Sequence, residues 1–70
     1  MSKFSERLLA LRKERNLNQE DLLEEFDISI RTYRRYETGV SEKIILSTLR
    51  KMADFYGVSV DYLIGRSDIR

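Results

Sequence analysis

The stretch NQEDLLEEFDISIRTYRRYETG, residues 18–39, decides the fold, because it predicts two short helices joined by a tight turn. Asn18 suits the position just before a helix, and Asp21 stands three residues later as its capping-box partner, where Glu is more usual. Apolar side chains then follow at helical spacing, at Leu22, Leu23 and Phe26. The apolar pattern stops there, so the first of the two helices should end at about Phe26.

The second half of the stretch predicts the turn and the second helix. Asp27 tolerates the left-handed backbone that a tight turn requires, and Ser29 offers a second helix cap. From Ser29 onward the helical period places two tyrosines on one side and three arginines on the other. The tyrosines are Tyr33 and Tyr36, and the arginines are Arg31, Arg34 and Arg35. Two capped helices separated by about three residues form a helix-turn-helix, and its second helix would expose the arginines.

This stretch resembles the helix-turn-helix of the Cro and phage-repressor family, often called Xre-like. The matching residues within it are Leu17-Asn18-Gln19, Asp21-Leu22, Ile28-Ser29 and Tyr36-Glu37-x-Gly39. Further matches are Leu8 with Leu11-Arg12, and the series Leu49, Met52-Ala53 and Tyr56 to Gly65. The likeness covers about Phe4 to Gly65. It implies an all-α fold, a compact five-helix repressor-like domain over residues 1–65 with the helix-turn-helix at helices 2 and 3, and it leaves residues 66–70 as a tail.

The composition excludes several classes of protein. The chain has 70 residues, no cysteine and no histidine, so one small domain is expected and disulfides and the usual zinc ligands are excluded. The longest apolar run, Leu8 to Leu11, is too short for a membrane span or a secretory signal. We therefore expect a soluble cytoplasmic domain without metal or other cofactor. Catalysis is not expected, because no nucleophile–base set or glycine-rich phosphate loop is present.

The charged residues are segregated along the chain, although the formal net charge is only +1. Residues 1–17 carry five basic and two acidic side chains, residues 18–27 carry five acidic and no basic ones, and residues 28–39 carry three arginines and one glutamate. A nucleic acid responds to the local field, so a balanced total does not oppose DNA binding. The alternative is that the charged residues only keep a small domain in solution.

The flanking sequence predicts three more helices. The first should begin near Ser2 or Ser5 and end at about Arg15, where Asn16 accepts the left-handed conformation that closes a helix. Residues 40–43 should form a loop, with Ser41 as a candidate cap. The fourth helix has an apolar stripe, formed by Ile45, Leu49, Met52, Ala53 and Tyr56. Gly57 should end it, and Ser59 should cap a short fifth helix.

The resemblance implies which residues meet DNA. At the start of the second motif helix, Ile30, Arg31, Arg34 and Arg35 would face the bases or the backbone in the major groove. Gln19 resembles the family glutamine that contacts a phosphate and braces the recognition helix. Asn18, Ser29 and Thr38 complete the predicted DNA-binding set. The alternative for the arginines is an ordinary solvated helix face, and the alternative for Tyr33 and Tyr36, which we expect in the core, is stacking on bases.

The resemblance also implies an ion pair between Arg12 and Glu37, which would tie the first helix to the third. Three positions depart from the family pattern: Asp27 replaces a usual glycine, Leu23 a usual small residue and Tyr33 a usual aliphatic one. We therefore expect some cost in the turn and an altered spacing or tilt of the two motif helices.

A double-stranded DNA operator is the expected partner, bound by a weak homodimer that forms fully on DNA, because one helix reads too few base pairs. The candidate dimer surface comprises Ile44, Ile45, Tyr62 and Ile69. The alternative function is a protein-interaction module with the same fold, such as an antitoxin or an antirepressor target. The acidic residues Glu20, Asp21, Glu24 and Glu25 and an exposed Ile44-Ile45 pair would suit that alternative.

Overall fold

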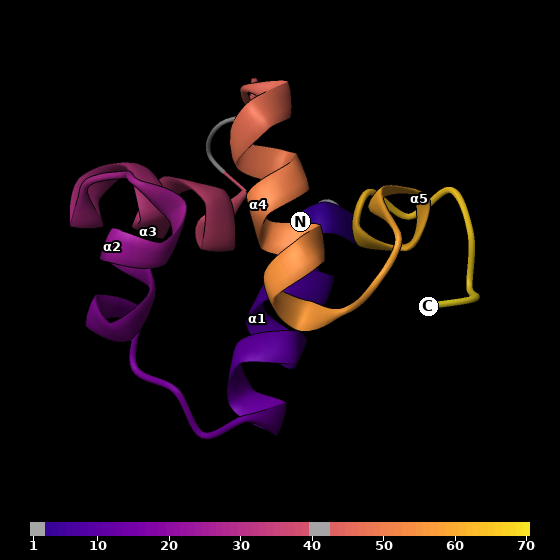
Figure 1. Ribbon diagram of the computed structural model, residues 1–70, viewed down its shortest axis with the longest axis horizontal. Helices are drawn as coiled ribbons and strands as arrows, with labels where there is room; N and C mark the ends of the chain where they lie inside the picture. Colours follow the sequence, from indigo (N-terminus) through magenta and orange to yellow (C-terminus); the bar gives the residue numbers. More distant parts are fainter. Residues whose placement is uncertain (1–2, 40–42) are drawn as a thin grey trace.

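The computed structural model describes residues 3–39 and 43–70, and within them every regular element is helical. The elements are α1 (Lys3–Glu14), the 3₁₀ turn η1 (Gln19–Leu22), α2 (Leu23–Phe26), α3 (Ile30–Thr38), α4 (Leu46–Tyr56) and α5 (Val60–Leu63). Figure 1 shows α4 crossing the middle of the molecule, with α2 and α3 on one side and α5 on the other. The predicted all-α, five-helix architecture is confirmed.

Local sequence signals set most helix ends as predicted. The hydroxyl oxygen of Ser29 accepts the Thr32 N–H at 3.2 Å, and that of Ser59 accepts the Tyr62 N–H at 3.0 Å. Such caps satisfy N–H groups that the first turn of a helix leaves without a partner. Asp27 adopts the left-handed conformation with φ of 54°, which turns the chain between α2 and α3.

The first motif helix is not continuous, which corrects the prediction of one helix between its cap, Asn18, and Phe26. It consists of η1 followed by a single α-helical turn, α2. The Asp21 N–H donates to the Asn18 carbonyl at 3.1 Å, and the Asp21 carboxylate accepts the Asn18 N–H at 2.8 Å. The backbone bond spans three residues instead of four, which defines the tighter 3₁₀ turn, and the bond to the Asp21 carboxylate is the capping bond that the sequence predicts.

One core joins all the helices. Its completely buried members come from α1, η1, α3, α4 and α5 and are Leu8, Leu22, Tyr33, Met52 and Leu63. The prediction that Tyr33 and Tyr36 lie in the core is confirmed, because both are buried. The ring of Tyr33 stacks on that of Phe26, with ring centroids 6.3 Å apart. Burying a side chain of this size stabilises the fold by roughly 1.5–3 kcal/mol.

The start of α4 differs from the prediction. Ile45 was expected in the apolar stripe, but it is 68% exposed, while Ile44 packs against the core. Ile45 has an extended backbone and precedes the helix, so the side chains of Ile44 and Ile45 point to opposite sides. The candidate cap Ser41 lies outside the described residues. The exposed apolar pair is therefore Ile45 with Leu46, which is 62% exposed, and not Ile44 with Ile45.

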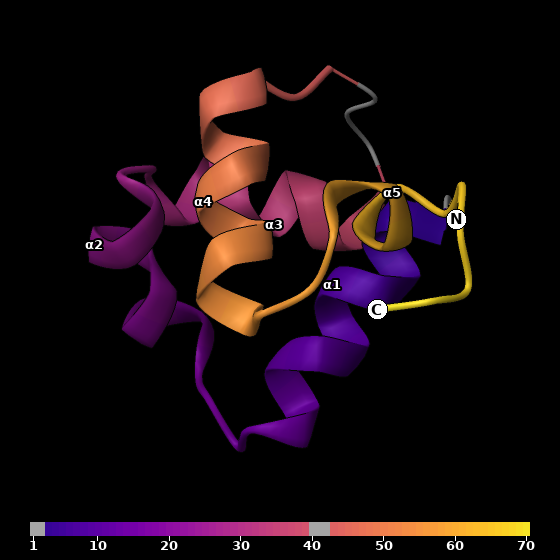
Figure 2. The ribbon, with the colours of Figure 1, turned by 45° about the vertical axis from the view of Figure 1, so that its right-hand side comes forward.

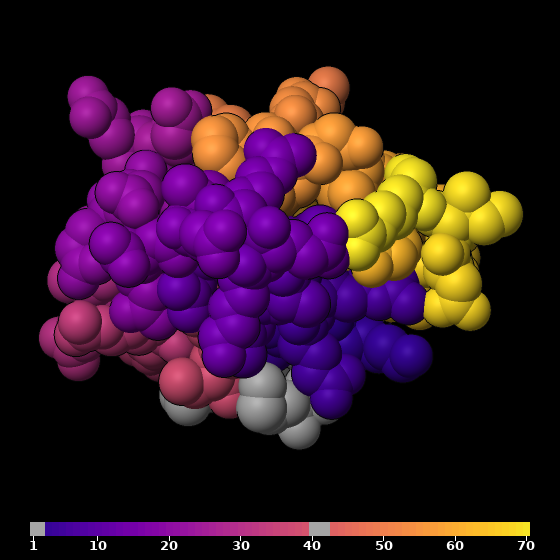
Figure 3. All heavy atoms as spheres, turned by 90° about the horizontal axis from the view of Figure 1, so that it is seen from below, coloured from indigo at the N-terminus to yellow at the C-terminus, as the bar shows by residue number. Residues whose placement is uncertain are grey.

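Residues 66–70 have no regular structure, but they are bonded to the rest of the domain. Arg7 donates to the Ser67 carbonyl and to the Asp68 carboxylate. Arg70 forms an ion pair with Glu14 at 2.6 Å, and the Ser59 N–H donates to the Arg70 carbonyl. Figure 3 shows these yellow C-terminal atoms lying against the violet atoms of α1. No helix among the described residues is long and apolar enough to span a membrane.

Candidate nucleic-acid interface

Helix α3 has one face in the core and the opposite face in solvent. Tyr33, Tyr36 and Glu37 are buried, whereas Arg31, Arg34, Arg35 and Thr38 are exposed. This division follows from helical spacing, because residues three or four apart share a face. Arg31 and Arg35, one turn apart, have no ion pair within residues 3–39 and 43–70. Their guanidinium groups are thus available to an anionic partner.

The other predicted contact residues surround this face. Ser29 lies at the amino end of α3, where its hydroxyl serves as the helix cap and also donates to the Thr32 hydroxyl at 3.0 Å. Ile30 is half-buried in the first turn of α3. The Thr38 hydroxyl donates to the Arg34 carbonyl at 2.9 Å, so it is turned back onto its own helix. Asn18 is exposed at the start of η1.

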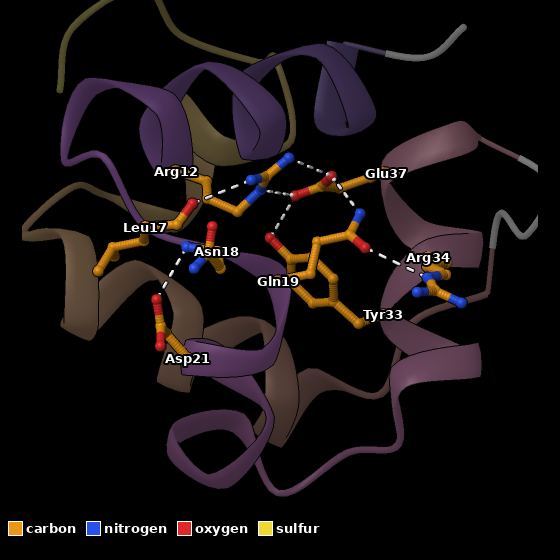
Figure 4. A network of polar contacts seen from close by, with 8 residues as sticks. All are labelled: Arg12, Leu17, Asn18, Gln19, Asp21, Tyr33, Arg34 and Glu37. Atoms are coloured by element: carbon orange, nitrogen blue, oxygen red, sulfur yellow. Dashed lines mark hydrogen bonds and ion pairs between the residues drawn. The ribbon is translucent and has the colours of Figure 1, made fainter.

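A buried carboxylate, that of Glu37, anchors α3 to α1 and η1 (Figure 4). The ion pair implied by the resemblance is present, with Arg12 Nε 2.7 Å and Arg12 Nη2 3.1 Å from the two carboxylate oxygens of Glu37. The Tyr33 hydroxyl and the Gln19 amide also donate to this carboxylate, the latter at 3.0 Å. Arg12 additionally donates to the Leu17 carbonyl at 2.9 Å, which fixes the chain just before η1.

The hydrogen bonds keep Glu37 ionised. Burial would raise the pKa of Glu37, but hydrogen bonds from Arg12, Tyr33 and Gln19 outweigh burial and lower the pKa below its ordinary value. The hydrogen bond to Glu37 likewise raises the pKa of Arg12, against the effect of burial. Burial, followed by the hydrogen bond to Glu37, raises the pKa of the Tyr33 hydroxyl. The cluster is therefore a charged pair with neutral donors around it.

Gln19 connects this cluster to the exposed face. Its amide nitrogen donates to Glu37, and its amide oxygen accepts the Nε–H of Arg34 at 3.2 Å. Figure 4 shows Gln19 lying between the two side chains. The sequence did not reveal the bond between Gln19 and Arg34, because it joins two elements at positions 15 residues apart. The bond between Tyr33 and Glu37 spans four residues of one helix, and helical spacing could have revealed it.

Two arginines of α1 and Arg15, which follows it, serve the fold and are not part of a free basic surface. Arg12 pairs with Glu37, and Arg7 binds the C-terminal segment. Arg15 donates to the carbonyls of Phe55 and Tyr56, each at 3.0 Å, which satisfies acceptors at the carboxyl end of α4. Three of the five basic residues among residues 1–17 are therefore engaged in contacts within the molecule, whereas Arg31 and Arg35 of α3 have no ion pair among the described residues.

The four residues of the candidate dimer surface do not form one patch. Ile44 is half-buried, and the half-buried ring of Tyr62 lies beneath the Arg7 guanidinium at 4.1 Å. Ile45 at the start of α4 and Ile69 near the C-terminus are exposed. Figures 1 and 2 both place the start of α4 well away from the C-terminal segment. The four acidic residues of η1 and α2 are exposed, as a solvated face would be.

Comparison with known proteins agrees with this geometry. A family model described as "Helix-turn-helix" matches residues 8–63. The chain is 38% identical over 65 residues to the cryptic phage CTXphi transcriptional repressor RstR of Vibrio cholerae, covering 93% of this chain and 58% of the repressor. It is 40% identical over 65 residues to the uncharacterized HTH-type transcriptional regulator YobD of Bacillus subtilis, covering 93% of this chain and 57% of that protein.

A solved structure has the same fold. The crystal structure of a transcriptional regulator from Listeria innocua superposes with a TM-score of 0.79 at 31% sequence identity. The match covers 89% of this chain and 57% of that one. The chain thus spans less than two thirds of the length of each of these relatives.

Proposed function

Because this chain belongs to the helix-turn-helix family, we propose that it is a sequence-specific transcriptional regulator that binds double-stranded DNA. The observation that carries the proposal is the outer face of α3, where Arg31 and Arg35 are exposed without an ion pair in the described part of the chain. A helix of this kind fits the major groove, and arginine is the commonest reader of guanine there. The repressor and regulators that the chain resembles support the same conclusion.

The residues of the interface have different proposed roles. Arg31, near the amino end of α3, enters the groove most deeply, and Arg35 reaches the neighbouring base or the opposite strand. Ile30 contacts a thymine methyl group or a sugar. Arg34 lies toward the flank of the helix, beside η1, and binds a phosphate. Asn18, Ser29 and Thr38 line the same surface and position the backbone of the DNA.

The protein is proposed to act in the cytoplasm as a weak homodimer that forms fully on adjacent half-sites. One recognition helix reads only about four or five base pairs, which is too few for a specific site. Two protomers on one DNA molecule stabilise each other by proximity, even where the contact between them is small. Exposed Ile45 and Leu46, at the start of α4, are apolar residues available for such a contact.

Binding measurements test the function directly. The protein should bind random duplex DNA at low salt, with an affinity that falls as salt rises, because phosphate contacts release counterions. Selection from genomic fragments should then recover sites with a common half-site sequence and spacing, bound more tightly than random duplex. Absence of binding even at low salt would contradict the proposal and favour the protein-interaction module. Binding without any preferred sequence would leave a DNA-binding protein that is not sequence-specific.

A further inference from the structure

The outer face of α3 offers guanidinium donors and neither a carboxylate nor an amide. Its exposed side chains are Arg31, Arg34, Arg35 and Thr38, while the one carboxylate of the helix, that of Glu37, is buried and bonded to other side chains. No asparagine, glutamine or aspartate occurs among the nine residues of α3, all of which the structure describes. A guanidinium group only donates hydrogen bonds, so the charged groups of this face act as donors alone.

The two exposed hydroxyl groups on this side of α3 donate within the helix. The Ser29 hydroxyl donates to the Thr32 hydroxyl at 3.0 Å, and its oxygen accepts the Thr32 N–H at 3.2 Å. The Thr38 hydroxyl donates to the Arg34 carbonyl at 2.9 Å. A hydroxyl that uses its proton in this way cannot donate it to a base. The guanidinium groups are therefore the principal donors that the face offers to a base edge.

Two of the three arginines, Arg31 and Arg35, are aligned along the helix. They are four residues apart, which is about 40° more than one turn and about 6 Å along the helix axis. Arg34 is turned to the side, where its Nε–H donates to the Gln19 amide oxygen at 3.2 Å. Successive base pairs lie about 3.4 Å apart. A helix that lies along the groove therefore brings Arg31 and Arg35 to bases within two base-pair steps of each other.

From this arrangement we infer that the operator half-site presents two guanines to α3, within two base-pair steps of each other, on the same strand or on opposite strands. The inference rests on the proposed function and adds the base composition of its target. In the major groove guanine has two neighbouring acceptors, N7 and O6, which suit a guanidinium group. Adenine places a donor beside N7, cytosine presents a donor, and thymine has a single acceptor. Arg31 reads one guanine and Arg35 reads the other.

Selection of bound duplexes from a random-sequence library tests the composition. At moderate salt, where phosphate contacts alone hold DNA weakly, the recovered half-sites should share two G·C pairs at this spacing. Replacing either pair by A·T should weaken binding about 5- to 150-fold, the effect of losing one bidentate contact. Recovered half-sites that share a sequence without two guanines at this spacing would overturn the inference and leave the proposed function intact. Recovery of no shared sequence would overturn the proposed function, and the inference with it.

Base analogues test which arginine reads which guanine. 7-Deazaguanine lacks the N7 acceptor and still pairs with cytosine, so at either guanine it should weaken binding about 10-fold or more, the effect of one hydrogen bond to a charged group. In Arg31→Ala the analogue should have no further effect at one guanine and its full effect at the other, and Arg35→Ala should show the reverse. If both guanines stay sensitive in both variants, these arginines do not read them and the inference is wrong.

The matched controls are a third arginine and a second base. Arg34→Ala removes an exposed arginine of the same helix that is turned aside, so the analogue should keep its full effect at both guanines. 7-Deazaadenine, placed at each adenine of the half-site in turn, should leave the affinity almost unchanged, because the outer face of α3 has no amide to pair with adenine. A loss at an adenine as large as the loss at the guanines would show adenine readout and overturn the inference.

Discussion

At Glu37 one carboxylate joins α1, η1 and α3. It receives hydrogen bonds from Arg12, Gln19 and Tyr33, and its side chain is almost fully removed from water. Removing one partner of such a pair leaves a buried charge uncompensated, which costs far more than the pair contributes in net stability. The exposed pair of Arg70 and Glu14 has a similar N···O distance, but water and salt screen it. It therefore adds little to the free energy of unfolding.

Glu37→Gln should lower the melting temperature clearly. The expected loss of unfolding free energy is about 3 kcal/mol, the low end of the range for a broken buried pair, because Arg12 retains some contact with water. Thermal or urea denaturation followed by circular dichroism measures the loss. Glu14→Gln removes the exposed pair and is the matched control, with almost no expected change. Equal effects of the two substitutions would contradict a special role for Glu37.

The Glu37 carboxylate should make the free energy of unfolding depend on pH. The pKa of Glu37 is lower in the folded chain than its ordinary value of 4.5, so folding favours the ionised form. This contribution is complete at pH values above the unfolded pKa and is lost as the pH falls through the lower, folded pKa. The stability difference between the parent and Glu37→Gln should therefore be constant near pH 7 and shrink below about pH 4.5. A difference that stays constant down to pH 3 would argue against the lowered pKa.

Alanine substitutions of the three arginines of α3 should differ in their effect on sequence specificity. A bidentate contact with guanine contributes about 1–3 kcal/mol of discrimination, so Arg31→Ala and Arg35→Ala should weaken operator binding and leave random-duplex binding nearly intact. Arg34→Ala should weaken both and reduce the salt slope by about one charge. Titration of operator and scrambled duplex across a salt series measures both quantities. If all three variants lose affinity equally for both DNAs, α3 reads phosphate and not sequence.

At the scale of the element, features that depend on neighbouring residues could be predicted from the sequence. Features that depend on contacts between residues distant in the sequence could not. The caps at Ser29 and Ser59 and the left-handed residue Asp27 depend on neighbours in the chain, so the sequence was enough to predict them. The break between η1 and α2, and the outward direction of Ile45, depend on how each segment meets the core. Helical periodicity carries no information about such contacts.

Asp27→Gly should stabilise the turn between α2 and α3. Asp27 has φ of 54°, a conformation that costs a residue with a β-carbon about 1–2 kcal/mol, although Asp tolerates it better than most. Glycine removes this strain but loses more entropy on folding, so we expect a net gain of about 0.5 kcal/mol. Denaturation by urea measures the gain. Asp27→Ala, which keeps the β-carbon and removes the carboxylate, should be destabilising, and a stabilising Asp27→Ala would show that the carboxylate is the source of the cost.

At the scale of the molecule, the resemblance predicted the order of the helices and the pair of Arg12 and Glu37, but not how the surface is divided. Arg7, Arg12 and Arg15 are three of the five basic residues among residues 1–17, yet each binds a different part of the fold. The bond between Gln19 and Arg34 joins separate elements and required three-dimensional packing to be seen.

The large exposed apolar residues in the described part of the chain, Ile45, Leu46 and Ile69, lie at two separate places, so we expect no tight dimer. Sedimentation without DNA should therefore show mostly monomer at micromolar concentration, and two protomers should assemble on a full operator. Ile45→Asp should reduce this assembly on DNA if α4 provides the contact, while Ile69→Asp, at the other exposed site, serves as the comparison. A stable dimer unaffected by either substitution would place the contact elsewhere, and one protomer per operator would contradict dimeric recognition.

The hydrogen bond between Gln19 and Arg34 also has an evolutionary consequence. Positions 31 and 35 face solvent without an ion pair among the described residues, so under the proposed function substitutions there should change the preferred operator while the core stays intact. Position 34 is linked through Gln19 to the carboxylate that holds the helices together. A lineage that acquires a new target should therefore diversify freely at positions 31 and 35, whereas positions 19 and 34 should mutate together or stay fixed. Substitutions would then accumulate at different rates at positions 31 and 35 and at positions 19 and 34.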